Sequence, residues 1–200
     1  MELFLNATSP YARMVRIVVL EKGLAEMVTL RWCDPWTDDA ALLDANPAGR
    51  IPALIIQDGT ALSESFIIAF YLDGLGRSEP IIPTARLNEV LHLAGLGQGL
   101  MDGAFTTVIS RKHLGSEVDD SVLGQRRWRA MQRILDRLET ELDESRVAPA
   151  MTLGEISVAV ALDYLGFRLP EANWASSRPR LEAWHRRVIA GQSFQETAFK

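Results

Sequence analysis

The chain has 200 residues, of which 48% are hydrophobic and 24% charged, and its formal net charge is −5 at pH 7. This length suits two small domains better than one small core. The negative charge argues against general binding of nucleic acid or of acidic membranes, because no basic block offsets it. The single cysteine, Cys33, excludes an internal disulfide and an all-cysteine metal site.

Two features of the chain bear on its location. Residues 1–4 carry no basic leader ahead of a long apolar core, so we expect no secretory signal. The most apolar run, residues 157–169, contains Asp163 and Arg168 and is too short to span a bilayer. We therefore expect a cytoplasmic protein with no membrane contact, and the net charge leads us to expect no nucleic-acid partner.

The three histidines are scattered along the chain without the spacing of a metal motif. We therefore expect no metal site.

The first part of the chain, residues 1–75, predicts a domain of alternating strands and helices. Apolar alternation indicates the strands, and apolar residues three and four positions apart indicate the helices. Asp58-Gly59 is a hairpin signature, and Gly23 suits the end of a helix. In chain order, the predicted elements are strands at 2–6 and 28–33, helices at 10–22 and 39–45, hairpin strands at 53–56 and 61–62, and a helix from residue 65.

Residues 76–83 have the glycine and proline density of a linker, and the alternating pattern disappears after them. Residues 84–200 predict a second, all-helical domain. Thr152 and Glu155 form a capping-box pattern, and Ser177 followed by Pro179 indicates another helix start. The predicted helices span 84–112, 121–144, 152–165 and 177 to about 191. Several glycines in the first of these either permit close helix packing or mark a bend.

The segment Ser9-Pro10-Tyr11-Ala12-Arg13 is the most informative one in the chain. Serine before proline predicts a helix N-terminus, where a hydroxyl and unbonded backbone N–H groups favour an anion. The segment resembles the Cys-Pro-Tyr-Cys of glutaredoxins with both cysteines replaced, by Ser9 and Ala12. A thiol-binding site without its own thiols suggests a protein that borrows one, and glutathione is the obvious candidate. Taken alone, Ser9 also fits a simple helix cap.

Two further segments point to one family. Residues 46–54, Asn-Pro-Ala-Gly-Arg-Ile-Pro-Ala-Leu, closely resemble the Asn-Pro-x-Gly-Lys-Val-Pro-x-Leu of glutathione transferases, and residues 62–65, Leu-Ser-Glu-Ser, resemble the Glu-Ser pair of that family. The order of elements, α/β and then all-α, is also similar. The resemblance implies a thioredoxin-like N-terminal domain followed by an all-helical C-terminal domain. The opening is similar to that of bacterial, cytosolic, Ser-type members with an omega- or theta-like motif.

The resemblance implies a catalytic role for Ser9, which would stabilise the glutathione thiolate, with Thr8 as the rival donor. The proline at position 52 is cis in the family, so we expect a cis Ile51–Pro52 bond. The backbone of Ile51 is implied to pair with the cysteinyl part of glutathione, in the manner of a short added strand.

The charged ends of glutathione are implied to meet three other side chains. Arg50 would meet the glycyl carboxylate, Glu64 the γ-glutamyl ammonium, and Ser65 the γ-glutamyl α-carboxylate. Each residue also has a plainer interpretation. Arg50 fits the surface arginine of a tight turn, and Glu64 with Ser65 fits a simple capped helix start with a solvated glutamate.

The resemblance also implies a second-substrate pocket between the domains, with walls from Tyr11, Met101, Phe105 and Arg111. The implied reaction is attack by the thiolate of glutathione, as co-substrate, on a small electrophile, by a homodimer acting in detoxification. Two alternatives stay open. One is a glutathione-dependent reductase or peroxidase, and the other is a non-catalytic member that binds ligands or partner proteins.

Overall fold

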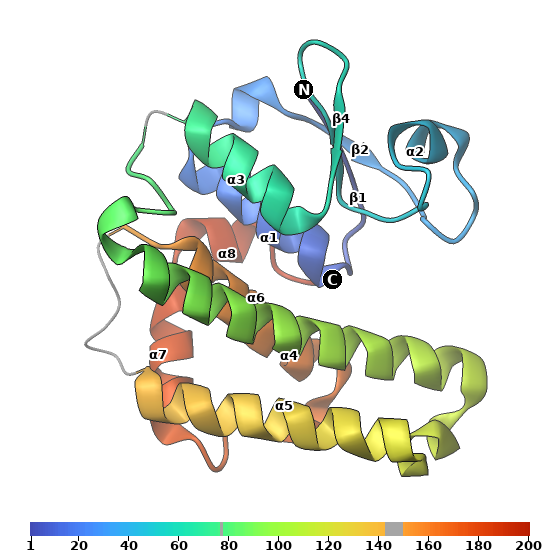
Figure 1. Cartoon of the computed structure of the whole chain (residues 1–200), viewed down its shortest axis with the longest axis vertical. Helices are drawn as coiled ribbons and strands as arrows, with labels where there is room; N and C mark the ends of the chain where they lie inside the picture. Colours follow the sequence, from blue (N-terminus) through green and yellow to red (C-terminus); the bar gives the residue numbers. More distant parts are fainter. Residues whose placement is uncertain (77, 143–149) are drawn as a thin grey trace. The chain divides into compact units, whose positions relative to one another are not determined.

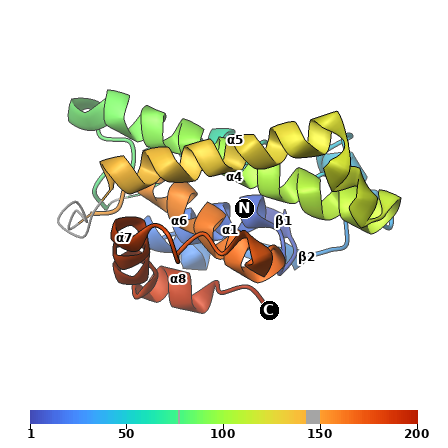
Figure 2. The same ribbon diagram turned by 90° about the horizontal axis from the view of Figure 1, so that it is seen from below.

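The computed structural model describes residues 1–76, 78–142 and 150–200. The chain divides into two compact units. The first contains residues 1–87 together with 196–200, and the second contains residues 88–195. Figures 1 and 2 show both units from two directions.

The first unit is built on a four-stranded sheet in the order β2-β1-β3-β4. β2 runs parallel to β1, whereas β3 is antiparallel to both β1 and β4. The turn between β3 and β4 contains Gly59 at φ +88°, a conformation that glycine adopts without steric cost, so the predicted hairpin is confirmed. The strands are β1 (Glu2–Leu5), β2 (Thr29–Trp32), β3 (Ala53–Ile55) and β4 (Ala61–Ser63).

Strand β1 is buried on both faces. Consecutive residues of a strand point to opposite faces, and Leu3, Phe4 and Leu5 are all at most 3% exposed. Helices therefore cover both faces, and Figure 1 shows α1 and α3 to one side of the strands and α2 to the other. These helices are α1 (Pro10–Glu21), α2 (Ala40–Ala45) and α3 (Ser65–Leu75), with short 3-10 turns η1 (Ala25–Met27) and η2 (Thr84–Arg86).

Helix α1 begins and ends where local residues predict. Ser9 is the N-cap residue, and its Oγ accepts a hydrogen bond from the Ala12 N–H at 3.2 Å. Pro10 occupies the first helical position. At the other end Gly23 has φ +65°, the left-handed conformation that commonly follows a helix.

A buried ion pair fastens α1 to the segment after α3. Lys22, whose side chain is 1% exposed, has its Nζ 2.9 Å from Asp73 Oδ1. The same ammonium donates to the carbonyl oxygens of Ser78 and Glu79, while the Asp73 carboxylate accepts the backbone N–H groups of residues 81–82. The described part of the predicted linker is therefore held against the first unit.

The regular elements described for the second unit are helical. Helix α5 ends at Glu141, and the backbone of Leu142 is extended. The helix was predicted to continue to residue 144, which is wrong at residue 142. Residues 143–144 lie outside the described residues. No helix among the described residues is long and apolar enough to cross a membrane. The helices are α4 (Leu87–Leu114), α5 (Val122–Glu141), α6 (Leu153–Arg168), α7 (Pro179–Ile189) and α8 (Gln192–Glu196), with 3-10 turns η3 (Ser116–Asp120) and η5 (Pro170–Ala172).

Two glycines let α4 and α6 approach each other closely. A Cβ added at Gly97 would lie 2.3 Å from Ser157 Oγ, and one added at Gly154 would lie 2.7 Å from the Val90 carbonyl oxygen. A larger residue at either position would push the helices apart, because protein interiors are already close-packed. Of the two interpretations of the glycines in α4, close packing therefore holds at Gly97.

Helix α6 is the centre of the second core, as predicted. Every residue from 153 to 162 is buried. The capping box is present: Thr152 Oγ1 accepts the Glu155 N–H, and the Glu155 carboxylate accepts the Thr152 N–H at 2.7 Å. Two N–H groups that begin the helix are thus satisfied within four residues of sequence. The predicted fold class, a small α/β sheet domain followed by an all-helical domain, is confirmed.

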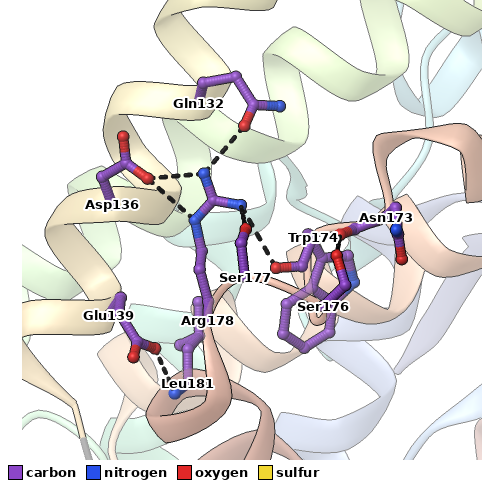
Figure 3. Close-up of polar contacts among 9 residues, drawn as sticks. All are labelled: Gln132, Asp136, Glu139, Asn173, Trp174, Ser176, Ser177, Arg178 and Leu181. Carbon is purple, nitrogen blue, oxygen red and sulfur yellow. Dashed lines mark hydrogen bonds and ion pairs between the residues drawn. The ribbon is translucent and has the colours of Figure 1, made fainter.

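A buried arginine fastens the segment before α7 to α5, as Figure 3 shows. Arg178 Nε and Nη2 lie 3.0 and 2.6 Å from Asp136 Oδ1, and Nη2 also donates to Gln132 Oε1. Nη1 donates to the Trp174 carbonyl oxygen and to the Ser177 hydroxyl. This guanidinium therefore meets acceptors on both sides, which a buried charge requires.

Helix α7 begins at Pro179, but its cap comes from another helix. The expectation that Ser177 starts it is wrong, since the N-cap residue is Arg178, whose side chain makes no capping bond. Instead Glu139 of α5 accepts the N–H group of Arg180 at 3.2 Å and that of Leu181 at 2.7 Å. Figure 3 shows the contact with Leu181. A carboxylate at this end of a helix also interacts favourably with the helix dipole.

The last residues of the chain pack against α1. Arg13 is 4% exposed. Its Nε lies 3.4 Å from Thr197 Oγ1, and its guanidinium carbon lies 4.4 Å from the centre of the Phe199 ring. Residues 196–200 therefore belong to the first unit, a return of the chain that no local pattern predicts.

Replacing Lys22 by methionine should lower the free energy of unfolding by up to about 3 kcal/mol, because it leaves the largely desolvated Asp73 carboxylate without its cation. Urea and thermal unfolding measure the change. The matched control is Arg31→Met, which breaks the exposed Arg31–Glu2 pair of the same unit and should cost at most about 1 kcal/mol. Equal costs for the two variants would contradict the prediction.

Candidate functional site

Three separate segments meet at one end of the sheet. Phe4 of β1 pairs with Ala53 of β3, and Ala53 pairs with Ser63 of β4. At this end β1 leaves toward α1, β3 enters from the preceding turn, and β4 leads into α3. The strand register therefore brings the start of α1, residues 51–52 and the start of α3 to the same end of the sheet.

Ser9 is held at this end by three hydrogen bonds. Its N–H donates to Asn6 Oδ1 at 2.8 Å, and its carbonyl oxygen accepts the Arg13 N–H at 3.0 Å. Its Oγ accepts the Ala12 N–H, and the residue is 8% exposed. Among residues 1–76, 78–142 and 150–200 the hydroxyl proton has no acceptor. Ser9 can therefore donate a hydrogen bond to an added group.

The turn that enters β3 contains the expected cis peptide bond between Ile51 and Pro52. Asn46 braces this turn, because its Nδ2 donates to the Arg50 carbonyl oxygen at 2.7 Å and its Oδ1 accepts the Ala48 N–H. Ile51 and Pro52 are both buried. The brace leaves the short segment before β3 in a defined conformation beside the end of β1.

The start of α3 combines an unusual backbone with an uncapped helix. Glu64 has φ +68° and ψ 121°, a region that L-residues with a side chain rarely occupy. No described side chain caps α3, although Ser65 is its first residue and is buried. The first N–H groups of α3 and the Ser65 hydroxyl therefore favour an anion at this point.

Arg50 and Glu64 meet each other across the site. Arg50 Nη2 lies 3.2 Å from Glu64 Oε1, and the two side chains are 71% and 60% exposed. An exposed pair of this kind contributes at most about 1 kcal/mol, because water screens both charges. Two residues expected to contact the same ligand are thus brought together, and their pairing opens at little cost.

Cys33 also lies at this end of the sheet, because Leu5 and Trp32 are paired and the Cys33 N–H donates to the Leu5 carbonyl oxygen. The thiol is half-buried, with Sγ 3.8 Å from the same oxygen. Burial, and then the negative charge of Asp39, raises the pKa of the Cys33 thiol. A raised pKa lowers the fraction of reactive thiolate.

The four residues expected to line a second-substrate pocket lie in different units. Tyr11 belongs to α1 of the first unit, whereas the other three belong to α4 of the second. Met101 is fully buried, and Phe105 is half-buried. Arg111 pairs with Asp119, with Nη2 2.6 Å from Oδ2, and with Glu171, so its charge is already matched twice. A role for these residues in a pocket stays a prediction.

One residue that positions the site was not singled out by sequence reasoning. Asn6 accepts the N–H groups of Thr8 and Ser9. It had a local signal, since asparagine shortly before a helix commonly accepts backbone N–H groups two or three residues on. Within the described ranges, no cluster of three or more histidine, cysteine, aspartate or glutamate side chains forms a metal site.

Comparison with known proteins identifies the class. A family model of the glutathione S-transferase N-terminal domain matches residues 8–75, and a model of the glutathione S-transferase C-terminal domain matches residues 122–187. Together they cover most of the chain. The chain therefore belongs to the glutathione S-transferase family.

Individual relatives match over nearly the whole length. A glutathione transferase family member from Pseudomonas fluorescens Pf-5, solved with bound glutathione, is 33% identical and has a TM-score of 0.89, covering 100% of this chain and 98% of that one. A glutathione S-transferase from Methylobacillus flagellatus KT, also with glutathione bound, is 28% identical with a TM-score of 0.86 and 98% coverage of both chains. The uncharacterized GST-like protein YibF of Escherichia coli K12 is 29% identical over 98% of both chains.

The positive φ of Glu64 suits glycine better than any residue with a side chain. Glu64→Gly should be more stable than Glu64→Ala by about 1 kcal/mol, because both remove the carboxylate but only glycine relieves the positive φ. In ordinary strand or helix positions glycine is instead the less stable of the two by about 0.5–1 kcal/mol. Urea unfolding of the two variants measures the difference, and an alanine variant as stable as the glycine variant would refute it.

Proposed function

We propose that this protein is a glutathione S-transferase that binds glutathione at the end of the sheet and holds its thiolate beside Ser9. The observation that carries the proposal is the Ser9 hydroxyl, which caps α1 through its oxygen and whose proton has no acceptor in the described part of the chain. The family membership and two relatives solved with glutathione support it.

In this proposal the peptide part of glutathione lies along residues 51–52. The Ile51 N–H and carbonyl oxygen pair with the cysteinyl residue like one more strand beside β3. The uncapped start of α3, with Ser65, receives the γ-glutamyl α-carboxylate. Arg50 takes the glycyl carboxylate and Glu64 the γ-glutamyl ammonium, so the Arg50–Glu64 pair is exchanged for two pairs with the ligand.

The reaction requires the thiol to be ionised near neutral pH. A free thiol has a pKa of about 8.5, and lowering it by about two units takes roughly 2.7 kcal/mol of preferential stabilisation of the anion. A hydrogen bond to a charged group contributes about 1.5–3 kcal/mol, and the N-terminus of α1 adds about 0.3–1 kcal/mol. Donation by Ser9 and the dipole of α1 are together of the required size.

A glutathione-dependent reductase or peroxidase remains the alternative activity. Such chemistry ordinarily uses a reactive cysteine, and position 9 holds serine. Cys33 has a raised pKa, which also favours transfer over thiol exchange. Turnover of a small glutathione mixed disulfide, measured beside conjugation of a chlorodinitrobenzene, separates the two activities.

The second substrate in this proposal is a small electrophile, and the protein acts as a cytoplasmic homodimer. The dimer is supported by exposed apolar side chains in each unit. These include Phe70 on α3, which is 69% exposed, and Leu91 on α4, which is 55% exposed.

Titration calorimetry with glutathione tests binding. We expect a saturable heat with a Kd below about 1 mM, which corresponds to more than about 4.1 kcal/mol. The dipeptide γ-glutamylcysteine, which lacks the glycyl carboxylate, should bind about ten- to a hundredfold more weakly, because one charge-assisted hydrogen bond is lost. In Arg50→Gln this gap between the two ligands should vanish. Absence of binding at millimolar glutathione would favour the non-catalytic alternative.

Ser9→Ala should lower kcat/KM about ten- to a hundredfold while leaving the affinity for glutathione nearly unchanged, because the other contacts remain. Steady-state conjugation of a chlorodinitrobenzene measures the rate. Thr8→Val is the matched control, since it removes the rival hydroxyl one residue earlier. A loss confined to Thr8→Val would transfer the role to Thr8, and unchanged rates in both would remove the hydroxyls from the mechanism.

A further inference from the structure

We propose that Asn6 is a positioning residue of this site. Its carboxamide oxygen holds the backbone that carries both candidate hydroxyls, and its neutrality keeps a negative charge away from the thiolate. This inference rests on the proposed function, and it concerns a residue outside the segments that carry the family resemblance.

The contacts of Asn6 define the turn between β1 and α1. Asn6 follows the last residue of β1 directly. Its Oδ1 accepts the Thr8 N–H at 3.1 Å and the Ser9 N–H at 2.8 Å. One acceptor that binds two successive N–H groups fixes the local path of the chain, as in other turns built on asparagine. Both candidate donors of the thiolate hydrogen bond therefore depend on the same side chain.

The contact with Asn6 differs in kind from the other two that hold Ser9. The bonds to Ala12 and Arg13 lie within the first turn of α1 and form wherever that helix forms. The bond to Asn6 instead connects Ser9 to the end of β1. It therefore sets where the hydroxyl stands relative to the sheet, and hence relative to the turn at residues 51–52.

The neutrality of the side chain follows from the same geometry. Aspartate would accept the two N–H groups equally well, since both side chains favour such turns. A carboxylate bonded to the Ser9 N–H, however, would stand one residue away from the sulfur anion. A nearby like charge disfavours the charged form, so aspartate here would raise the pKa of the bound thiol. The site requires an acceptor without a charge.

Three variants of Asn6 separate these two roles. Asn6→Ala removes both hydrogen bonds and should raise the pKa of bound glutathione toward the free value of about 8.5, with kcat lowered at least about tenfold. Asn6→Ser keeps a shorter, neutral acceptor and should recover part of both losses. Asn6→Asp keeps the turn and the glutathione affinity but should raise the pKa by about one unit through charge repulsion, so its kcat recovers as the pH rises.

The readouts are the ultraviolet absorbance of the bound thiolate against pH, the pH profile of kcat, and glutathione affinity by calorimetry. A role limited to folding would leave the pKa of the bound thiol unchanged in an Asn6→Ala protein that still binds glutathione, and that result would overturn the positioning role. An unchanged pKa in Asn6→Asp would overturn the requirement for a neutral side chain. If Asn6→Ala does not fold, Asn6→Ser takes its place.

A double variant tests whether Asn6 acts through a hydroxyl. Asn6→Ala is combined with Ser9→Ala or Thr8→Val, whichever lowers the rate by itself. We expect the double variant to be no slower than the single hydroxyl variant, because residues in one network are not additive. Additive losses would overturn the positioning role. If wild-type protein binds glutathione without a thiolate signal, the proposed function itself fails, and Asn6 then has no ionised sulfur to serve.

Discussion

The register of β1, β3 and β4 is the constraint on which the site depends. A shift of one residue would turn every side chain of β1 to the opposite face. Leu3, Phe4 and Leu5 are all buried, so helices on both faces resist such a shift. The same pairing brings Ser9, the cis bond at residues 51–52 and the start of α3 to one end of the sheet. Packing in the core thus brings these segments to one end of the sheet, where local contacts such as that of Asn6 with Ser9 fix their details.

The ion pairs of the protein differ in how readily they can be exchanged. Arg50 and Glu64 are exposed, so separating them costs at most about 1 kcal/mol, and a ligand with opposite charges at its two ends can replace both partners. Lys22 is buried and the Asp73 side chain is only 11% exposed, and removing either partner leaves a largely desolvated charge without its counter-ion. Arg111 already meets two carboxylates. Of these ion pairs, the exposed pair of Arg50 and Glu64 is the one that lies at the proposed glutathione site.

Sequence reasoning succeeded where the determining residues are adjacent. The caps of α1 and α6 were predicted because Ser9 with Pro10, and Thr152 with Glu155, act within one turn of their own helix. The hairpin at Asp58-Gly59 was predicted for the same reason. The cis bond before Pro52 was expected from resemblance, since no local pattern distinguishes the two isomers.

Sequence reasoning failed where the partner is distant along the chain. The cap of α7 comes from Glu139, on another helix, so the local pattern at Ser177 was misleading. The pairs Arg50–Glu64 and Lys22–Asp73 depend on strand pairing and helix packing that no short segment contains. Asn6 is the intermediate case, because its bonds are local but its segment carries no family resemblance.

The contact of Arg13 with Thr197 and Phe199 makes the helical unit an insertion within the first unit. The α/β unit emerges from the ribosome before the helical unit, yet its buried arginine meets these partners only after residues 197–199 have also emerged. These contacts therefore form only once the helical unit has been made, although that unit supplies neither partner. Residues 196–200 thus join the unit that residues 1–87 began.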